Sequence, residues 1–424
     1  MSTAPAPAPP AASAPADRRR VVLTGFGVIS SIGTGVEEYT AGLRAGRSGA
    51  RPITVFDTEG FGQNIACEVP DFDPRAWIRN IPLDDVGRAG QFAVSAARMA
   101  VEDAGLTEAD LGDRQAVITV GTTDGESHDI ALLLEQELAA GDPEAMDPAL
   151  SRRINAGRLS TAIARELRMP NVEAVTVTTA CAAGNYSIGY GLDAIRSGEV
   201  DIALCGGADA VCRKAFALFK RFGALTPDVV RPFDKDRQGI LTGEGAGILV
   251  LESLESALAR GARIHAEVLG YGLSCDAAHP TAPNREGIAR GIRRALDDAG
   301  VKEQEIDFIS AHGTGTKAND RTESAAILDV YGDAAPRTVA VKSMLGHSMG
   351  AASALGAIAC GLAIEHGFIP PTINHRETDP ECPLDVVPNE AVDADVRVVQ
   401  NNSSAFAGNN AVLILGTYGE RVSP

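Results

Sequence analysis

The chain has 424 residues, and 45% of them are hydrophobic, so it is long enough to bury a large core. A net charge of −18 gives it a negative average field, which argues against a general nucleic-acid binder. Its seven cysteines include no C-x-x-C pair, and no apolar run reaches the roughly 20 residues that span a bilayer, so we expect a cytoplasmic protein with reduced thiols.

The first sixteen residues, MSTAPAPAPPAASAPA, are rich in alanine and proline and lack the apolar segment of a secretory signal. We predict a disordered tail over residues 1–20. The folded part is expected to begin at 21–33 with a buried strand that runs into a turn. Gly25 and Gly27 suggest a dinucleotide fingerprint, but Ser30 stands where the third glycine would be, and no phosphate loop occurs. We therefore reject both nucleotide-binding interpretations.

Two stretches of the chain repeat each other in the same order. Each has an amphipathic helix, then an apolar strand ending in Gly-Thr, then a strand, a glycine-rich turn and a small-residue helix: 97–111 and 292–306, 116–123 and 307–314, 174–195 and 338–359. Alternating strand–helix units predict parallel strands with helices covering both faces of the sheet. The repeat predicts two related α/β halves, residues 21–265 and 266–424.

Cys181 follows a predicted strand and precedes a predicted buried helix. That helix contains three glycines, each costing about 1 kcal/mol relative to alanine, so we expect a neighbouring backbone to pack very close to it. A cysteine at a helix N-terminus faces unpaired N–H groups that favour the nucleophilic thiolate. A buried cysteine is more often inert, which is how we interpret Cys205 and Cys360.

Two histidines, like Cys181, lie next to the end of a predicted strand or the start of a small-residue helix. His312 ends a predicted strand, where functional side chains of parallel sheets emerge, and His347 lies between glycines before another small-residue helix. Each can also be a capping or core histidine. A metal site is weakly supported, because no third ligand accompanies them at ligand spacing.

These residues lie in four segments that resemble the signature segments of the β-ketoacyl synthases: TTACAAGNYSIGYG, HGTGTKANDRTES, VKSMLGHSMGA and NNSSAFAGNNAVLIL. The resemblance covers residues 21–418 in the family's order. It implies a thiolase fold, an α/β architecture of two pseudo-duplicated halves layered α-β-α-β-α. It also implies the following site: a nucleophile at Cys181, the histidines His312 and His347, the supporting Lys342 and Glu323, the gate and oxyanion-hole residue Phe406, and the pantetheine contacts Thr314 and Thr316.

The chemistry of condensation agrees with this assignment. A thiolate must accept an acyl group, which Cys181 can do, and an enolate must then be stabilised after decarboxylation. Two imidazole N–H groups can hold the malonyl thioester carbonyl while charge develops. We expect Lys342 and Glu323 to form a buried ion pair that orients the histidines. The family usually has Gly-Phe-Gly-Gly at the gate, whereas this chain has Ala405-Phe406-Ala407-Gly408, and alanine resists the positive φ that glycine allows.

NDRTES and TDPECPLDVVPNEA are similar to the ketosynthase subunit of bacterial type II polyketide synthases, and CAAGNYSIGYG to ketosynthases that build reduced or polyene chains. The resemblance implies an acyl carrier protein as partner, its phosphopantetheine arm as part of the substrate, no bound catalytic cofactor, and a homodimer or a heterodimer with a chain-length-factor-like subunit. The alternatives are a fatty-acid elongation synthase, a non-catalytic chain-length partner, which would lack the nucleophile, and a generic cysteine hydrolase.

Two further expectations concern the surface and the acyl tunnel. Carrier proteins are acidic, and Arg75, Arg79 and Arg88 are candidates for a basic docking patch, although a solvated surface is the simpler interpretation. Phenylalanines at helical spacing can line an acyl tunnel or pack in the core: Phe216, Phe219 and Phe222.

Overall fold

The computed structural model describes residues 18–419, so most of the predicted tail, at 1–17, lies outside the described residues. Residues 18–20, which we had assigned to the tail, are part of the fold. Each of these arginines pairs with a carboxylate of the body: Arg18 with Asp298, Arg19 with Asp201 and Arg20 with Glu267. These contacts tie the three residues before the first strand to the folded body.

One long mixed sheet is built from two groups of strands. The first group is β1 (Val21–Ser30), β8 (Gly245–Ser253), β7 (Ile202–Asp209), β5 (Ala116–Gly121) and β6 (Val172–Val177), in that spatial order. The second group repeats this order with β9 (Ala266–Cys275), β15 (Asn409–Gly416), β14 (Val398–Ser404), β10 (Phe308–Ser310) and β11 (Arg337–Val339). The groups meet at a short antiparallel pairing of β1 with β9, at Val22–Glu267 and Leu23–Ala266.

The expectation of purely parallel strands is wrong for part of each group. β5 pairs in parallel with β6 and β7, and β10 pairs in parallel with β11 and β14. The strands nearest the junction, β1, β8, β9 and β15, pair antiparallel with their neighbours. The sequence repeat detected the strand–helix units, but it did not predict the antiparallel pairing of these central strands.

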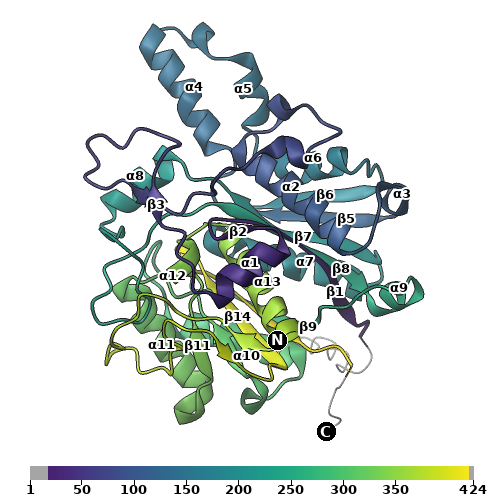
Figure 1. The fold of residues 1–424 in the computed structure, drawn as a ribbon, viewed down its shortest axis with the longest axis vertical. Helices are drawn as coiled ribbons and strands as arrows, with labels where there is room; N and C mark the ends of the chain where they lie inside the picture. The colour runs from purple at the N-terminus through teal and green to yellow at the C-terminus, as the bar shows by residue number, and fades with distance from the viewer. Residues whose placement is uncertain (1–17, 420–424) are drawn as a thin grey trace, which may run out of the picture.

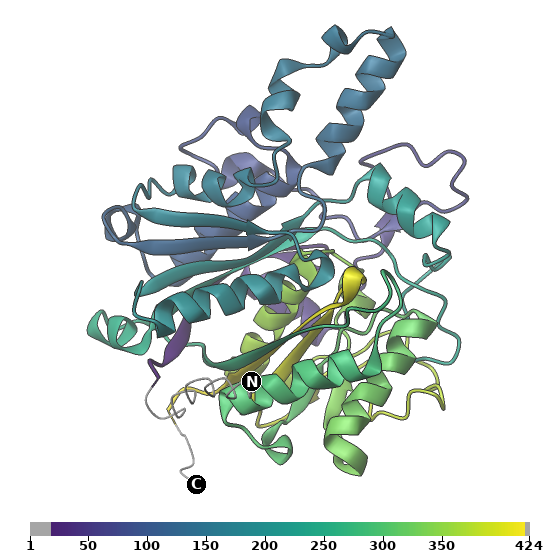
Figure 2. The same cartoon turned by 180° about the vertical axis from the view of Figure 1, so that it is seen from behind.

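Helices cover both faces of each group of strands and also fill the space between the groups (Figures 1 and 2). The outer helices are α2 (Arg88–Asp103) and α6 (Arg158–Glu166) on the first group, and α10 (Arg285–Ala299) and α11 (Lys317–Tyr331) on the second. Between the groups lie α7 (Ala183–Arg196) and α13 (Ala351–His366), which contact each other and both sets of strands. This is the α-β-α-β-α layering of the thiolase fold.

The remaining helices and strands are shorter or lie outside these layers. They are β2 (Gly33–Thr34), β3 (Arg51–Pro52), β4 (Ile65–Ala66), β12 (Phe368–Ile369), β13 (Val392–Asp393), α1 (Val36–Arg44), α3 (Glu108–Leu111), α4 (Ser127–Ala140), α5 (Pro148–Arg153), α8 (Arg213–Arg221), α9 (Leu254–Ala259) and α12 (Lys342–Leu345). Figure 1 shows α4 and α5 projecting away from the layered body. None of the helices within residues 18–419 has the length and apolar character needed to cross a bilayer.

The glycines of α7 are explained by close packing, as the sequence predicted. A Cβ added at Gly184 would lie 2.7 Å from the backbone nitrogen of Ala354 on α13, and one at Gly191 would lie 2.1 Å from Cys205 Sγ on β7. The helix therefore sits directly against its neighbours, where larger side chains would separate the layers. This packing sets the position of the turn that precedes α7 and carries Cys181.

Candidate active site

Cys181 lies in a tight turn between β6 and α7. It occupies the 3-10 turn Ala180–Ala182, which leads directly into the helix, and it is buried. Ala180 has a φ of 50°, a left-handed conformation that a residue with a Cβ adopts at an energetic cost and that is often found at functional sites. Ser403 Oγ on β14 donates a hydrogen bond to the carbonyl oxygen of Cys181 at 2.9 Å. The turn is thus held from both groups of strands.

The backbone at His312 is held from two sides. Glu323 accepts hydrogen bonds from the N–H groups of His312, at 2.7 Å, and Gly313, at 2.8 Å. Lys342 Nζ donates to the His312 carbonyl oxygen at 2.6 Å. Within the described part of the chain, no ion pair joins Lys342 to Glu323 directly, so the expected salt bridge is wrong. The two charges instead act through the peptide groups on either side of the histidine.

Both imidazoles use Nδ1 as an acceptor. The backbone N–H of Met349 donates to Nδ1 of His347 at 3.1 Å, and Lys342 Nζ lies 3.4 Å from Nδ1 of His312. In a neutral imidazole this leaves the proton on Nε2. Burial, reinforced by the Lys342 charge, lowers the pKa of His347 to about 3 and holds the pKa of His312 well below its usual value. Each ring is therefore neutral near pH 7 and offers one N–H donor.

These side chains converge on one cavity. It has a volume of about 80 Å³, and its lining includes Cys181, His312, His347, Thr314, Thr316 and Phe406. The two imidazole rings lie with their centroids 5.6 Å apart and nearly perpendicular, at 81°. Of the site residues expected from the sequence, only Lys342 and Glu323 lie outside this lining, behind His312. No group of three or more potential ligands among residues 18–419 is arranged to hold a metal ion.

The sulfur of Cys181 is a thiol in the resting structure. Burial raises its pKa to about 12, the positive charge of Lys342 lowers it in part, and the carboxylates of Asp209 and Asp124 raise it further. The helix N-terminus was expected to lower the pKa of this thiol, but burial raises the pKa by more.

The two alanines that flank Phe406 differ in backbone conformation. Phe406 lies between Phe219 and Phe222, with ring centroids 5.9 Å from each. Ala407 has a φ of 64°, the conformation that favours glycine, whereas Ala405 is extended with a φ of −129°. Only one of the two alanines is strained, and its N–H donates to the Pro280 carbonyl oxygen at 2.7 Å.

The three phenylalanines of the α8 region have different surroundings. Phe219 lines the cavity with Cys181. Phe216 instead packs against Phe56 and Phe61 in the core, and Phe222 is 52% exposed. The tunnel interpretation thus fits Phe219 alone.

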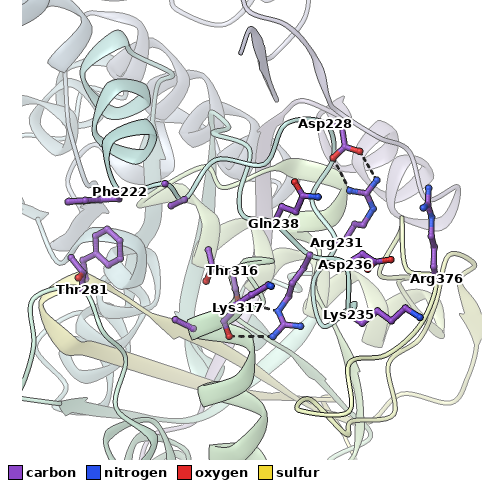
Figure 3. A pocket seen from close by; sticks show the side chains of 15 residues that line it. Phe222, Asp228, Arg231, Lys235, Asp236, Gln238, Thr281, Thr316, Lys317 and Arg376 are labelled. Atoms are coloured by element: carbon purple, nitrogen blue, oxygen red, sulfur yellow. Dashed lines mark hydrogen bonds and ion pairs between the residues drawn. The ribbon is translucent and has the colours of Figure 1, made fainter. Parts of the chain in front are cut away.

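A large cleft opens next to the inner cavity. Its volume is about 1090 Å³, and it shares Thr281, Thr316 and Phe406 with the cavity. Figure 3 shows Phe222 and Thr281 at one end and a group of basic side chains at the other. The basic residues in its lining are Arg231, Lys235, Arg237, Lys317 and Arg376. Below, this group is called the basic rim.

Two members of the basic rim differ from the other three, which form ion pairs. Lys317 and Arg376 are exposed, and neither forms an ion pair with any described residue. The arginines proposed from the sequence each face a carboxylate instead: Arg75 with Asp73, Arg79 with Glu102 and Arg88 with the buried Glu244. Sequence reasoning missed the rim because its members come from segments far apart in the chain, at 231–237, at the start of α11 and at Arg376.

Asp320 is a further residue that the sequence did not single out. Its buried carboxylate accepts the N–H groups of Thr314, at 3.1 Å, and Gly315, at 3.2 Å, and so fixes the loop that carries both threonines of the cavity. Its position in NDRTES, three residues before Glu323, was the available signal.

Comparisons with known proteins agree with this geometry. The family models for the β-ketoacyl synthase N-terminal and C-terminal domains match residues 18–257 and 265–376. The chain is 43% identical to nodulation protein E of Rhizobium sp. (strain N33), covering 93% of this chain and 98% of that protein. It is 38% identical to 3-oxoacyl-[acyl-carrier-protein] synthase 2 of Synechocystis sp., covering 95% of this chain and 99% of that protein.

Solved structures show the same likeness. The structure described as the ishigamide ketosynthase/chain length factor matches with 92% identity and a TM-score of 0.94, covering 95% of this chain and 100% of that one. A type II polyketide ketosynthase in complex with its acyl-carrier protein matches with 31% identity and a TM-score of 0.87, covering 95% of this chain and 100% of that one. With both domain models and nearly full-length relatives in agreement, the chain belongs to the β-ketoacyl synthase family of thiolase-fold condensing enzymes.

Proposed function

We propose that this chain is the catalytic ketosynthase of a type II polyketide system. It carries a growing acyl chain on Cys181 and extends it with malonyl-acyl carrier protein by decarboxylative Claisen condensation. The observation that carries the proposal is the single cavity lined by Cys181 and by two neutral imidazoles. The 92% identity to a ketosynthase/chain length factor structure supports the polyketide assignment.

In the first half-reaction, Cys181 Sγ attacks the thioester carbonyl of an acyl-carrier protein. The carbon–sulfur bond to the carrier breaks, the acyl group moves to Cys181, and the thiol proton ends on the sulfur of the carrier's phosphopantetheine arm. The backbone N–H groups of Cys181 and Phe406 stabilise the oxyanion of the tetrahedral intermediate. Lys342 assists by favouring the thiolate through its positive charge.

In the second half-reaction, the Nε2–H groups of His312 and His347 hold the thioester carbonyl oxygen of malonyl-carrier protein. The malonyl carboxylate leaves as carbon dioxide, and its electron pair becomes an enolate that both N–H groups stabilise. The enolate carbon attacks the acyl carbonyl on Cys181, the carbon–sulfur bond breaks, and the released thiolate takes up one proton from solvent. Neutral imidazoles suit this role because they are weak acids, so each stabilises the enolate by a hydrogen bond without protonating it.

The carrier protein is the proposed partner at the cleft. Thr314 and Thr316 lie where a pantetheine arm would enter the inner cavity, and the exposed Lys317 and Arg376 would face the acidic carrier. The chain itself would pair with a second copy or a chain-length-factor-like subunit. The projecting α4 offers an apolar face for that contact, since Ile130, Leu134 and Leu138 are exposed one helical turn apart.

Two alternatives remain within the family. A fatty-acid elongation synthase is favoured by the relatives described as 3-oxoacyl-[acyl-carrier-protein] synthase 2. A non-catalytic chain-length partner is compatible with the composite description of the 92% identical structure, but it would lack the nucleophile that Cys181 supplies.

The test is mass spectrometry after incubation with a panel of acyl-carrier proteins. An acyl adduct on Cys181 is expected, and its preferred chain length and oxidation state separate polyketide from fatty-acid substrates. Cys181→Ala should form no adduct and no condensation product. A Cys181→Ala enzyme that still condenses would refute the nucleophile, and a wild-type enzyme without any adduct would favour the non-catalytic partner.

A second variant separates the two half-reactions. His347→Ala should reduce malonyl decarboxylation by about 100-fold or more, as expected when a donor to a developing oxyanion is removed, and should affect acylation of Cys181 much less. Equal loss of both steps would contradict the assigned role of His347.

A further inference from the structure

A buried carboxylate outside the cavity lining joins the turn after β5 to the start of α13. Asp209, the last residue of β7, is fully buried and accepts four hydrogen bonds. Its Oδ1 accepts from Thr122 Oγ1 at 2.7 Å and from the Asp124 N–H at 3.0 Å. Its Oδ2 accepts from the Thr123 N–H at 2.7 Å and from the Gly350 N–H at 2.6 Å. Three donors come from the turn after β5, and the fourth comes from the turn that follows His347.

The bond to Gly350 connects Asp209 with the histidine turn. Gly350 is the N-cap of α13 and lies three residues after His347. A Cβ at Gly350 would lie 2.6 Å from Thr122 Cα and 2.8 Å from Asp209 Oδ2, so the turn is pressed against both. Between them, Met349 has a φ of 51° and donates its N–H to Nδ1 of His347. Anchoring Gly350 therefore fixes the strained residue that sets the orientation of the ring.

The other three bonds hold the turn after β5. Thr122 Oγ1 also accepts the N–H of Gly125 at 2.9 Å, so the Asp209 carboxylate organises the whole segment 122–125. Facing Asp209 are the titratable groups of Asp124, Cys181 and Cys212, and Lys214 neutralises Asp124 in an ion pair. No cation pairs directly with Asp209 in the described residues. Its four donors, three of them backbone N–H groups, take the place of a counter-ion.

We propose that Asp209 is a positioning residue for condensation: it holds the Gly346–Gly350 turn so that His347 presents its Nε2–H to the cavity. The proposal rests on the proposed role of His347 as donor to the malonyl carbonyl. It assigns Asp209 to the decarboxylation step and not to acylation, because its bond to Gly350 holds the turn of His347, whereas Ser403 holds the turn of Cys181. A leucine at 209 fills a similar volume but has no acceptor, so the turn loses its anchor.

The kinetic test compares both half-reactions. Asp209→Leu should lower malonyl decarboxylation by about 100-fold, since a displacement of about 1 Å in a positioned group has that effect, while acylation of Cys181 persists. Asp209→Asn keeps one oxygen for the Gly350 N–H and should lose only about tenfold, a partial rescue. Glu126→Gln is the matched control, because Glu126 is also buried and caps the backbone N–H groups of Ala89 and Gly90 away from the cavity. Parallel loss of both steps, or loss of neither, would overturn the proposal.

A spectroscopic test needs no turnover. NMR of protein labelled at histidine nitrogens, with His347 assigned by its absence in His347→Gln, should show an unprotonated Nδ1 and a protonated Nε2. Asp209→Leu should move these signals toward a tautomer mixture, and Asp209→Asn should move them less. Signals unchanged in both variants would overturn the proposal even if wild-type enzyme formed no acyl adduct. If Asp209→Leu does not fold, Asp209→Asn decides: unchanged decarboxylation and unchanged His347 signals refute the positioning role.

Discussion

At the scale of single residues, burial decides the chemistry of the cavity. The same exclusion of water that keeps His312 and His347 neutral also keeps Cys181 protonated, because a low-dielectric site disfavours every charge. Lys342 partly offsets this, although burial lowers its own pKa to about 8. The thiol of Cys181 is thus protonated and weakly reactive near neutral pH. Over the same pH range, both imidazoles keep one N–H donor.

This balance predicts the reactivity of Cys181 toward alkylation. The reaction with iodoacetamide should be slow at pH 7 and should accelerate by about tenfold per pH unit between pH 6 and 9, because only the thiolate reacts. Lys342→Met should slow it further by removing the charge that lowers the thiol pKa. Peptide mass spectrometry can follow the rate, with the exposed Cys275 as the internal reference. A rate at Cys181 that does not change with pH would mean that the thiolate is already formed.

At the scale of elements, the catalytic turn depends on how closely α7 approaches α13. Asn185 on α7 donates its side-chain amide to the carbonyl oxygens of Asn401 and Ala411, and its N–H to Ser353 Oγ. These bonds tie α7, which follows the Cys181 turn, to α13, β14 and β15. Glycine at 184 makes the approach possible, because the α13 backbone occupies the space that a side chain at this position would fill.

Gly184→Ala should therefore destabilise the fold. Alanine favours the helix by about 1 kcal/mol, but the clash with the buried Ala354 backbone costs about 1–3 kcal/mol and displaces the Cys181 turn. We expect a net loss of stability in urea unfolding and slower acylation of Cys181.

The control is Gly112→Ala, since Gly112 is also in helical conformation but has no atom closer than 3.4 Å to an added Cβ. That variant should unfold like wild type or slightly later. Equal behaviour of the two variants would show that helix packing at Gly184 is looser than the structure indicates.

At the scale of the whole molecule, the net charge of the chain is opposite in sign to the charge of the basic rim. The chain has a net charge of −18, yet the cleft beside the cavity carries the unpaired Lys317 and Arg376. An acidic carrier protein would be repelled by the average field and attracted by this local one, which would orient it toward the cavity.

Reversal of these charges should weaken docking. Lys317→Glu with Arg376→Glu should raise the KM for acyl-carrier protein by about tenfold at low salt, with little change in kcat, and the difference should shrink as salt screens the charges. The KM for a small acyl-pantetheine thioester should not change, because it makes no protein–protein contact. Arg75→Glu tests the alternative surface and should have little effect. A larger increase in KM for Arg75→Glu than for the double variant would indicate that the carrier protein docks on the surface around Arg75.

A buried histidine ties the layers together near the junction of the two strand groups. His265 lies between Asp103 of α2, 3.1 Å from Nε2, and Glu365 of α13, 2.7 Å from Nδ1. Burial lowers its pKa, but its interactions with both carboxylates outweigh this and raise the pKa to about 9. A pKa raised above that of the unfolded chain means that His265 contributes stability fully below about pH 6.5 and loses the contribution as pH rises through about 9.

The expected outcome is a pH-dependent difference between wild type and His265→Gln. The difference in unfolding free energy should shrink by about 3 kcal/mol between pH 6 and pH 10. Urea unfolding of both proteins across this range measures it. A difference that stays constant with pH would mean that His265 is not held in its charged form.

The sequence by itself determined the features that depend on neighbours along the chain. The strand–helix units, the small-residue helix after Cys181 and the four signature segments are local patterns, and they identified the thiolase fold and the family. They also singled out Cys181, His312 and His347, because each stands at the end of a strand or beside glycines in a segment of characteristic order.

Only the tertiary structure decided the features that depend on which distant residues meet. The antiparallel strands at the junction, the separate roles of Lys342 and Glu323, the protonated sulfur, the strained Ala407 and the basic rim all arise from contacts between segments far apart in sequence. Asp209 is the clearest case, since nothing beside it in the chain indicates that its carboxylate reaches Gly350. Burial and hydrogen bonding are properties of the folded neighbourhood, so a linear pattern can name the reacting residues but not the groups that hold them.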